Sequence, residues 1–90
     1  MNPISEKIKA GAAVIDVRTP DEFADGHYRN AKNIPIRDLM RRMGEIGEKS
    51  VPVVLYCETG SRSALAAKLL KASGFKDVIN AGGLEDMPEE

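Results

Sequence analysis

Residues 53–63 read VVLYCETGSRS, an unbroken apolar run that ends at Cys57 and gives way to a short polar loop. The apolar run is short, rich in β-branched residues and continuous rather than alternating, which is typical of a strand buried in a parallel sheet. We expect the clearest helix of the chain to begin near Arg62 and to run to about Ser73. This stretch therefore predicts one strand–loop–helix unit of an α/β fold.

A similar unit is predicted upstream. Residues 13–17 (AVIDV) form a second short, buried strand by the same criteria. Thr19 is expected to cap a brief helix in which Pro20 occupies the first position and Glu22 completes a capping box. Gly26 is expected to end that helix, so the chain again passes from strand to helix through a short connection.

The other segments extend this alternation. Helices are expected from Asn2 to Gly11 and over residues 39–46, and short strands over residues 32–35 and 77–79. In the helix after the Cys57 loop, we expect Leu65, Leu69 and Leu70 to face the core and Gly74 to form the C-cap. Residues 85–90 form an acidic tail that we expect to be frayed. The pattern predicts a single domain over residues 1–90, a three-layer α/β/α sandwich with a mainly parallel sheet of four to five strands.

Composition excludes several classes of function. The 90 residues are 42 % hydrophobic and 30 % charged, as in an ordinary soluble domain. A net charge of −1 gives no electrostatic footprint for nucleic acid or an anionic membrane, and the longest apolar run is far too short to span a bilayer. The start of the chain has no apolar leader pattern, and one cysteine can form neither an internal disulfide nor a metal cage. We therefore expect a cytoplasmic protein without metal or organic cofactor.

The loop after Cys57 is the candidate site. Functional crevices of α/β sheets lie at the carboxyl ends of strands, where Cys57 is placed. Gly60 allows the loop to curl so that backbone N–H groups, including the first of the next helix, point at one spot. Such a spot stabilises a thiolate or a persulfide anion, and Arg62 can bring a guanidinium towards an anionic substrate. The alternative is a packing role, because free cysteines are among the most buried residues.

Several segments, in order, resemble the rhodanese family. They are Asp16-Val17-Arg18 with Glu22-Phe23, Gly26-His27 with Asn33-Ile34-Pro35, Cys57-x-x-Gly60-x-Arg62-Ser63, and Gly74-Phe75 with Gly82-Gly83. Together they span nearly the whole chain. The resemblance implies a rhodanese-like fold and a sulfurtransferase in which Cys57 takes sulfane sulfur as a persulfide. The donor would be a small anion (thiosulfate or polysulfide) or a persulfide-carrying protein, and the acceptor a thiol or cyanide. By position, the resemblance implies that the substrate pocket is lined by Glu58, Thr59, Gly60, Ser61 and Arg62.

The departures from the family pattern carry further expectations. Glu58 stands where many thiosulfate-using members have a cationic residue, and a carboxylate there opposes a dianionic donor. A persulfide or polysulfide donor is therefore favoured over thiosulfate. No Trp follows Gly83, which predicts a more open pocket. Arg18 and Glu22 are expected to be framework residues that pair with each other.

Three other functions share parts of this pattern. A cysteine phosphatase or arsenate reductase is disfavoured because those enzymes place the arginine six positions after the cysteine, whereas Arg62 follows Cys57 by five. A non-catalytic rhodanese-like binding or regulatory module would keep the fold without sulfur transfer. A redox sensor would oxidise the same low-pKa thiol to sulfenic acid. The sequence leaves the last two open, together with the oligomeric state.

Overall fold

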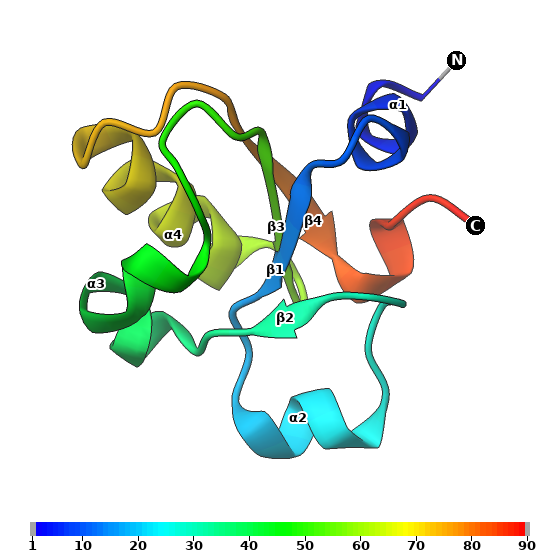
Figure 1. The fold of residues 1–90 in the computed structure, drawn as a ribbon. Helices are drawn as coiled ribbons and strands as arrows, with labels where there is room; N and C mark the ends of the chain where they lie inside the picture. The colour runs from blue at the N-terminus through cyan, green and yellow to red at the C-terminus, as the bar shows by residue number, and fades with distance from the viewer. Residues whose placement is uncertain (1, 90) are drawn as a thin grey trace.

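The computed structural model describes residues 2–89, in which four parallel strands form one sheet with the order β2-β1-β3-β4 (Figure 1). The strands are β1 (Ala13–Asp16), β2 (Lys32–Asn33), β3 (Val53–Cys57) and β4 (Val78–Gly83). All three pairings are parallel. Because β1 and β3 are neighbours and run the same way, the residues that follow each of them meet at one edge of the sheet.

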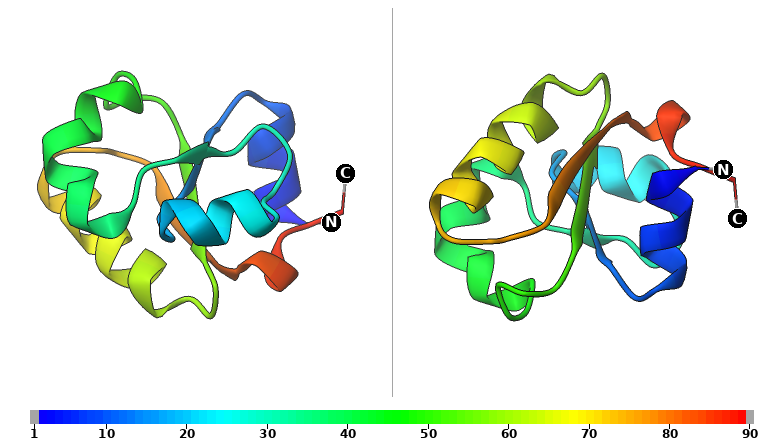
Figure 2. Two further views of the ribbon diagram at one scale, coloured as in Figure 1. Left: turned by 90° about the horizontal axis from the view of Figure 1, so that it is seen from below. Right: turned by 90° about the horizontal axis from the view of Figure 1, so that it is seen from above.

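Helices cover both faces of this sheet. They are α1 (Pro3–Lys9), α2 (Pro20–Asp25), α3 (Leu39–Arg42) and α4 (Ser61–Ala72), with the 3-10 turns η1 (Ile36–Asp38), η2 (Met43–Glu45) and η3 (Leu84–Asp86). In Figures 1 and 2, α3 and α4 lie on one side of the sheet, and α1 and η3 lie on the other. The predicted three-layer α/β/α architecture is confirmed. No helix within residues 2–89 has both the length and the apolar character needed to cross a membrane.

The core consists of two apolar clusters, one on each face. Alternate residues of a strand point to opposite faces, so β3 contributes to both. Val53, Leu55 and Cys57 join the cluster beneath α4, while Val54 and Tyr56 join the cluster beneath α1 and η3. This alternation sets the orientation of the site, because it directs the Cys57 side chain towards α4.

The prediction that Leu65 of α4 faces the core is wrong, because its side chain is 52 % exposed. The buried residues of α4 are Ser63, Ala66, Ala67 and Leu70. Their spacing of three, four and seven residues defines one stripe of a helix with 3.6 residues per turn. Leu65 lies outside that stripe, so its apolar character alone was a misleading guide.

Two further expectations need correction. The helix predicted over residues 39–46 is broken into α3 and η2, and Met40 on it is 60 % exposed. The segment after Gly83 is ordered rather than frayed as far as it is described, because η3 folds against the sheet and Met87 is buried. The hydroxyl of Tyr28 also donates a hydrogen bond of 2.9 Å to the carbonyl of Pro88. Glu90 of the predicted tail lies outside the described residues.

Candidate active site

The site is built on the sharp connection between β3 and α4. The strand ends at Cys57, and Gly60 precedes the first residue of α4 with φ of 103° and ψ of −14°. This left-handed conformation strains any residue with a side chain. A Cβ at Gly60 would also lie only 3.3 Å from the Cα of Gly82 on β4. Glycine therefore lets the loop curl back over the cysteine while packing against β4.

Hydrogen-bond donors converge on the sulfur of Cys57. The Gly60 N–H donates to Sγ at 3.0 Å, and both the N–H and the hydroxyl of Ser63 lie 3.4 Å from Sγ. The side chain of Cys57 is fully buried. Burial raises the pKa of this thiol, but hydrogen bonds from Ser63, Gly60 and Thr59 outweigh it and hold the pKa below its ordinary value. The site thus favours the thiolate, which is the nucleophilic form of cysteine.

Ser63 extends the predicted set of site residues by one position. Its hydroxyl lies 2.6 Å from Oδ1 of Asn80 on β4 as well as 3.4 Å from Sγ of Cys57. A hydroxyl has a single proton, so the bond to the sulfur competes with the bond to Asn80. Two sequence signals point to Ser63: it closes the Cys57-x-x-Gly60-x-Arg62-Ser63 segment, and it lies in the first turn of α4, where its N–H has no partner within the helix.

The last strand supports the loop from behind. Gly83 pairs with Cys57 in the sheet, and the pairing shifts register between Leu55 and Cys57. A Cβ at Gly83 would collide with the carbonyl oxygen of Glu58. The Gly83 N–H donates a hydrogen bond of 2.8 Å to the carboxylate of Asp86, and this bond holds the segment in place. The paired glycines therefore let the backbone of β4 approach the loop closely.

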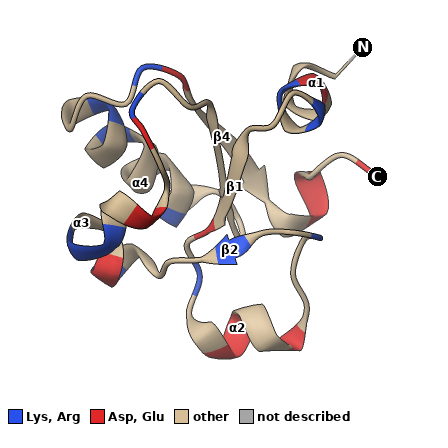
Figure 3. Ribbon diagram, in the orientation of Figure 1, with Lys and Arg blue, Asp and Glu red and all other residues tan. Residues whose placement is uncertain are grey.

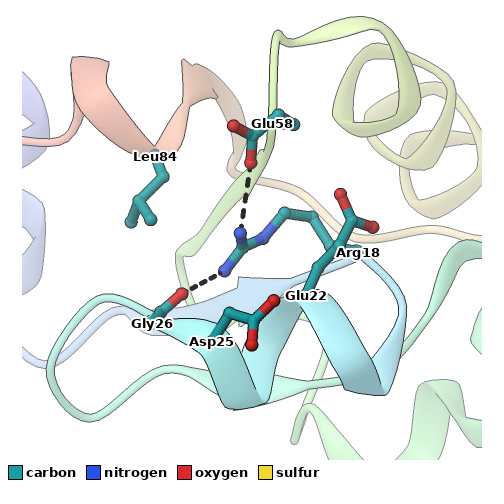
Figure 4. A pocket seen from close by; sticks show the side chains of 6 residues that line it. All are labelled: Arg18, Glu22, Asp25, Gly26, Glu58 and Leu84. Carbon is teal, nitrogen blue, oxygen red and sulfur yellow. Dashed lines mark hydrogen bonds and ion pairs between the residues drawn. The ribbon is translucent and has the colours of Figure 1, made fainter.

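Two ion pairs tie the flanks of the loop to the β1–α2 connection. Arg18 donates a hydrogen bond of 2.7 Å to Asp16. It also donates to the Gly26 carbonyl at 2.7 Å and to Glu58 at 3.2 Å (Figure 4). On the other flank, the guanidinium of Arg62 donates two hydrogen bonds to Glu22, at 2.7 and 3.0 Å.

The predicted pairing of Arg18 with Glu22 is therefore wrong. The Asp16 carboxylate lies two residues from Arg18 and holds its guanidinium through three hydrogen bonds, whereas Glu22 is placed by α2 to face Arg62. The hydrogen bonds from Arg62, and then the one from the Thr19 backbone, lower the pKa of Glu22 to about 2. The hydrogen bond with Asp16 raises the pKa of Arg18 further above its ordinary value. The Glu22–Arg62 pair therefore stays ionised well into the acidic range.

A pocket of about 390 Å³ lies beside the loop and is lined by Arg18, Glu22, Asp25, Gly26, Glu58 and Leu84 (Figure 4). Among the five residues expected to line a substrate pocket, Glu58 is the one that does so here. Thr59 and Gly60 instead direct backbone N–H groups at the sulfur, and Arg62 is engaged with Glu22. Ser61 is exposed at the start of α4.

The other lining residues were missed by sequence reasoning as pocket residues. Most of them follow β1, and the order of the sheet, which brings the end of β1 next to the end of β3, was the signal that could have found them. Figure 3 shows acidic residues along α2, and two of them, Glu22 and Asp25, line the pocket. Within residues 2–89, no three His, Cys, Asp or Glu side chains gather in a way that could hold a metal ion.

Comparison with known proteins assigns this architecture. A family model described as "Rhodanese-like domain" matches residues 2–89. The protein YqhL of Bacillus subtilis is 42 % identical over 81 residues, which cover 87 % of this chain and 64 % of YqhL. Thiosulfate sulfurtransferase PspE of Escherichia coli is 36 % identical over 74 residues, which cover 81 % of this chain and 71 % of PspE. The chain thus spans just under two thirds of YqhL, although it covers more of PspE.

Solved structures agree with the sequence matches. A structure described as a rhodanese with anions from E. coli has a TM-score of 0.83 at 33 % identity, covering 89 % of this chain and 95 % of the other. A rhodanese-related protein from Thermoplasma volcanium has a TM-score of 0.72 at 38 % identity, covering 91 % of this chain and 80 % of the other. These matches extend over the sheet and the helices on both of its faces.

Proposed function

We propose that this chain, which belongs to the rhodanese-like domain family, is a sulfurtransferase that carries sulfane sulfur as a persulfide on Cys57. The observation that supports the proposal most directly is the convergence of the Gly60 and Ser63 donors on Sγ of Cys57. The same donors that stabilise a thiolate stabilise the anion of a persulfide. The relatives named thiosulfate sulfurtransferase, PspE among them, support this class of reaction.

The first half-reaction loads the sulfur. The Cys57 thiolate attacks the sulfane sulfur of the donor and forms a new S–S bond, while the donor's own S–S bond breaks. The bonding pair leaves with the departing group, which is sulfite from thiosulfate or a thiolate from a persulfide. Both leave as anions that need no added proton, so no general acid is required, and the hydrogen bonds that lower the pKa of Cys57 favour the attacking thiolate.

The second half-reaction transfers the outer sulfur of the Cys57 persulfide to an acceptor. The sulfur of an acceptor thiolate, or the carbon of cyanide, attacks the outer sulfur of the persulfide. The S–S bond to Cys57 breaks, its electron pair returns to Sγ, and the product is a new persulfide or thiocyanate. The hydrogen bonds from Gly60 and Ser63 receive the regenerated thiolate.

The surroundings of the loop support a persulfide or polysulfide donor over thiosulfate. The carboxylate of Glu58 pairs with Arg18, and that of Glu22 pairs with Arg62. Both arginines near the loop therefore have their charge offset by a carboxylate, and little positive charge is left for a dianion.

The reaction is testable by thiocyanate formation from cyanide with polysulfide or thiosulfate as donor. Because cyanide also reacts directly with polysulfide, rates are taken above those of the enzyme-free mixture. We expect turnover with polysulfide, slower turnover with thiosulfate, and none above the enzyme-free rate with either donor in the variant Cys57→Ser. Because serine is close to cysteine in shape, the variant should keep its circular dichroism spectrum and serves as a folded control. A binding module or a redox sensor would not raise thiocyanate formation above the enzyme-free rate with either donor. Equal turnover by the wild type and Cys57→Ser would contradict the proposal.

A further inference from the structure

We infer that Glu58 determines the charge of the sulfur compounds that reach Cys57, and that it favours small compounds with an ammonium group beside the reacting sulfur. Low-molecular-weight aminothiols are the chemical class that meets this description. The inference rests on the proposed function, because it concerns which compounds use the same site. It reverses the usual expectation for an anion-stabilising loop, and it follows from the charges around the pocket.

The charged groups at this edge of the sheet leave an excess of negative charge. The carboxylates of Asp16, Glu22, Asp25 and Glu58 surround the guanidinium groups of Arg18 and Arg62. Four carboxylates against two guanidinium groups give a net charge of −2. A persulfide on Cys57 adds a further negative charge to the same region.

The distribution of these charges matters as much as their sum. Among the described residues 2–89, Arg18 is the one cation that lines the pocket, and its side chain is almost fully buried, with 4 % exposed. Its guanidinium already donates to Asp16, Gly26 and Glu58. The Glu58 side chain is 57 % exposed, so its carboxylate faces an incoming molecule while the Arg18 charge behind it is offset.

The Cys57 loop contributes one residue, Glu58, to the wall of the pocket. Glu58 lines the pocket and is the residue directly after Cys57. In Figure 4, the Glu58 side chain lies above Arg18, opposite Asp25 and Gly26 at the end of α2. A persulfide would carry its outer sulfur about 2 Å beyond Sγ.

The size of the pocket indicates a small molecule as the occupant. Its volume of about 390 Å³ lies at the lower end of the range for small-ligand pockets. Asp25 and Glu58 present exposed carboxylates that can accept hydrogen bonds from an ammonium group. Leu84 adds an apolar wall that suits the short carbon chain between an amine and a thiol.

The test uses two methanethiosulfonate reagents of similar size, one with a trimethylammonium group and one with a sulfonate group. The Cys57 thiolate attacks the divalent sulfur of the reagent and forms a mixed disulfide. The bond between that sulfur and the sulfonyl sulfur breaks, and methanesulfinate leaves with the electron pair. Cys57 is the single cysteine of the chain, so the intact mass reports modification at one position. The rate constants for modification of Cys57 by the cationic and by the anionic reagent are measured at low ionic strength, and their ratio is taken. This ratio is then divided by the ratio of the rate constants with which the two reagents modify 2-mercaptoethanol, a small uncharged reference thiol.

We expect this corrected ratio to be above one in the wild type and to fall towards one at high salt. One carboxylate at roughly 8 Å from the charged group of the reagent, in an effective dielectric constant of about 40, changes the rate of modification by each reagent about fivefold. Glu58→Gln and Asp25→Asn should each lower the ratio by at least that factor. Asp25 lies outside the loop, so its variant separates the effect of charge from any change in the thiolate itself. Glu48→Gln is the matched control, because it makes the same charge change on an exposed residue before β3, at the opposite end of the strand from Cys57.

A second experiment measures sulfur transfer from the Cys57 persulfide to cysteamine and to mercaptoacetate. The quantity compared is the ratio of the transfer rates to cysteamine and to mercaptoacetate. Dividing the wild-type ratio by the ratio of Glu58→Gln cancels the intrinsic reactivities of the two thiols. We expect the result to be about fivefold or more. Failure of the persulfide to form would count against the proposed function, while the reagent experiment would still decide the charge preference. A ratio below one, a ratio unchanged in both pocket variants, or no reaction of Cys57 with either reagent would overturn the inference.

Discussion

At the scale of single residues, the chemistry of the site depends on what surrounds one sulfur atom. The position of Cys57 at a strand end and the left-handed Gly60 could be predicted from the sequence, because an apolar strand, a glycine and a helix start occur within a few residues. The partner of Arg18 could not be predicted in the same way. Side chains of similar reach compete for each guanidinium, and only the folded arrangement places Asp16 and Glu58 beside Arg18 and Glu22 beside Arg62.

Ser63→Ala tests the hydrogen bonds to the sulfur. The change removes the hydroxyl that helps to hold the pKa of Cys57 below its ordinary value. Because the thiolate forms as pH rises through this pKa, the midpoint of the rate–pH profile should move to higher pH. Alkylation of Cys57 by iodoacetamide across a pH series measures the shift. Ser61→Ala alters an exposed serine in the same helical turn and should leave the midpoint in place; equal profiles for the two variants would contradict the assigned role of Ser63.

At the scale of secondary-structure elements, α2 is the least expected contributor to the site. Its capping box was predicted and is confirmed, with reciprocal bonds between Thr19 and Glu22. The same Glu22 carboxylate also binds Arg62 at the start of α4. This six-residue helix thereby connects the edge of the sheet to the loop, a role that local sequence patterns do not reveal because it depends on how two distant helices face each other.

Glu22→Gln tests the connection between α2 and α4. The pKa of Glu22 is lowered from 4.5 to about 2 in the folded protein, so its contribution to stability is present above about pH 4.5 and is lost as the pH falls towards 2. Glutamine can still complete a capping box, so the variant removes mainly the ion pair. Urea unfolding at pH 6 and pH 3 should show a smaller loss of stability on acidification in the variant than in the wild type, by on the order of 1 kcal/mol after solvent screening. The same loss in both proteins would argue against a stabilising pair.

At the scale of the whole molecule, the order of the sheet makes the site possible. The strand–helix alternation was sufficient to predict a parallel α/β sandwich, but it does not say which strands are neighbours. With β1 next to β3, the loops after both strands meet, and Gly82 and Gly83 of β4 close against the Cys57 loop. The pocket is therefore a product of topology, which explains why sequence reasoning found the loop and missed most of the pocket lining.

The packing of α4 on the sheet leads to a prediction about stability. Leu70 is fully buried, whereas Leu65 is about half exposed on the same helix. Leu70→Ala should lower the free energy of unfolding by about 2–5 kcal/mol, because it leaves a cavity in the core. Leu65→Ala should change it by about 0.5 kcal/mol or less. Chemical denaturation of the two variants side by side measures both values, and similar losses would contradict the assigned inward face.

The most direct test of the central claim is the intact mass of the protein after incubation with polysulfide and removal of excess donor. We predict that the wild type gains one sulfur atom, that peptide fragmentation places it on Cys57, and that cyanide removes it again with formation of thiocyanate. Cys57→Ser should gain nothing under the same conditions. A wild-type protein that gains no sulfur from polysulfide or thiosulfate, or that gains it at a position other than Cys57, would contradict the account.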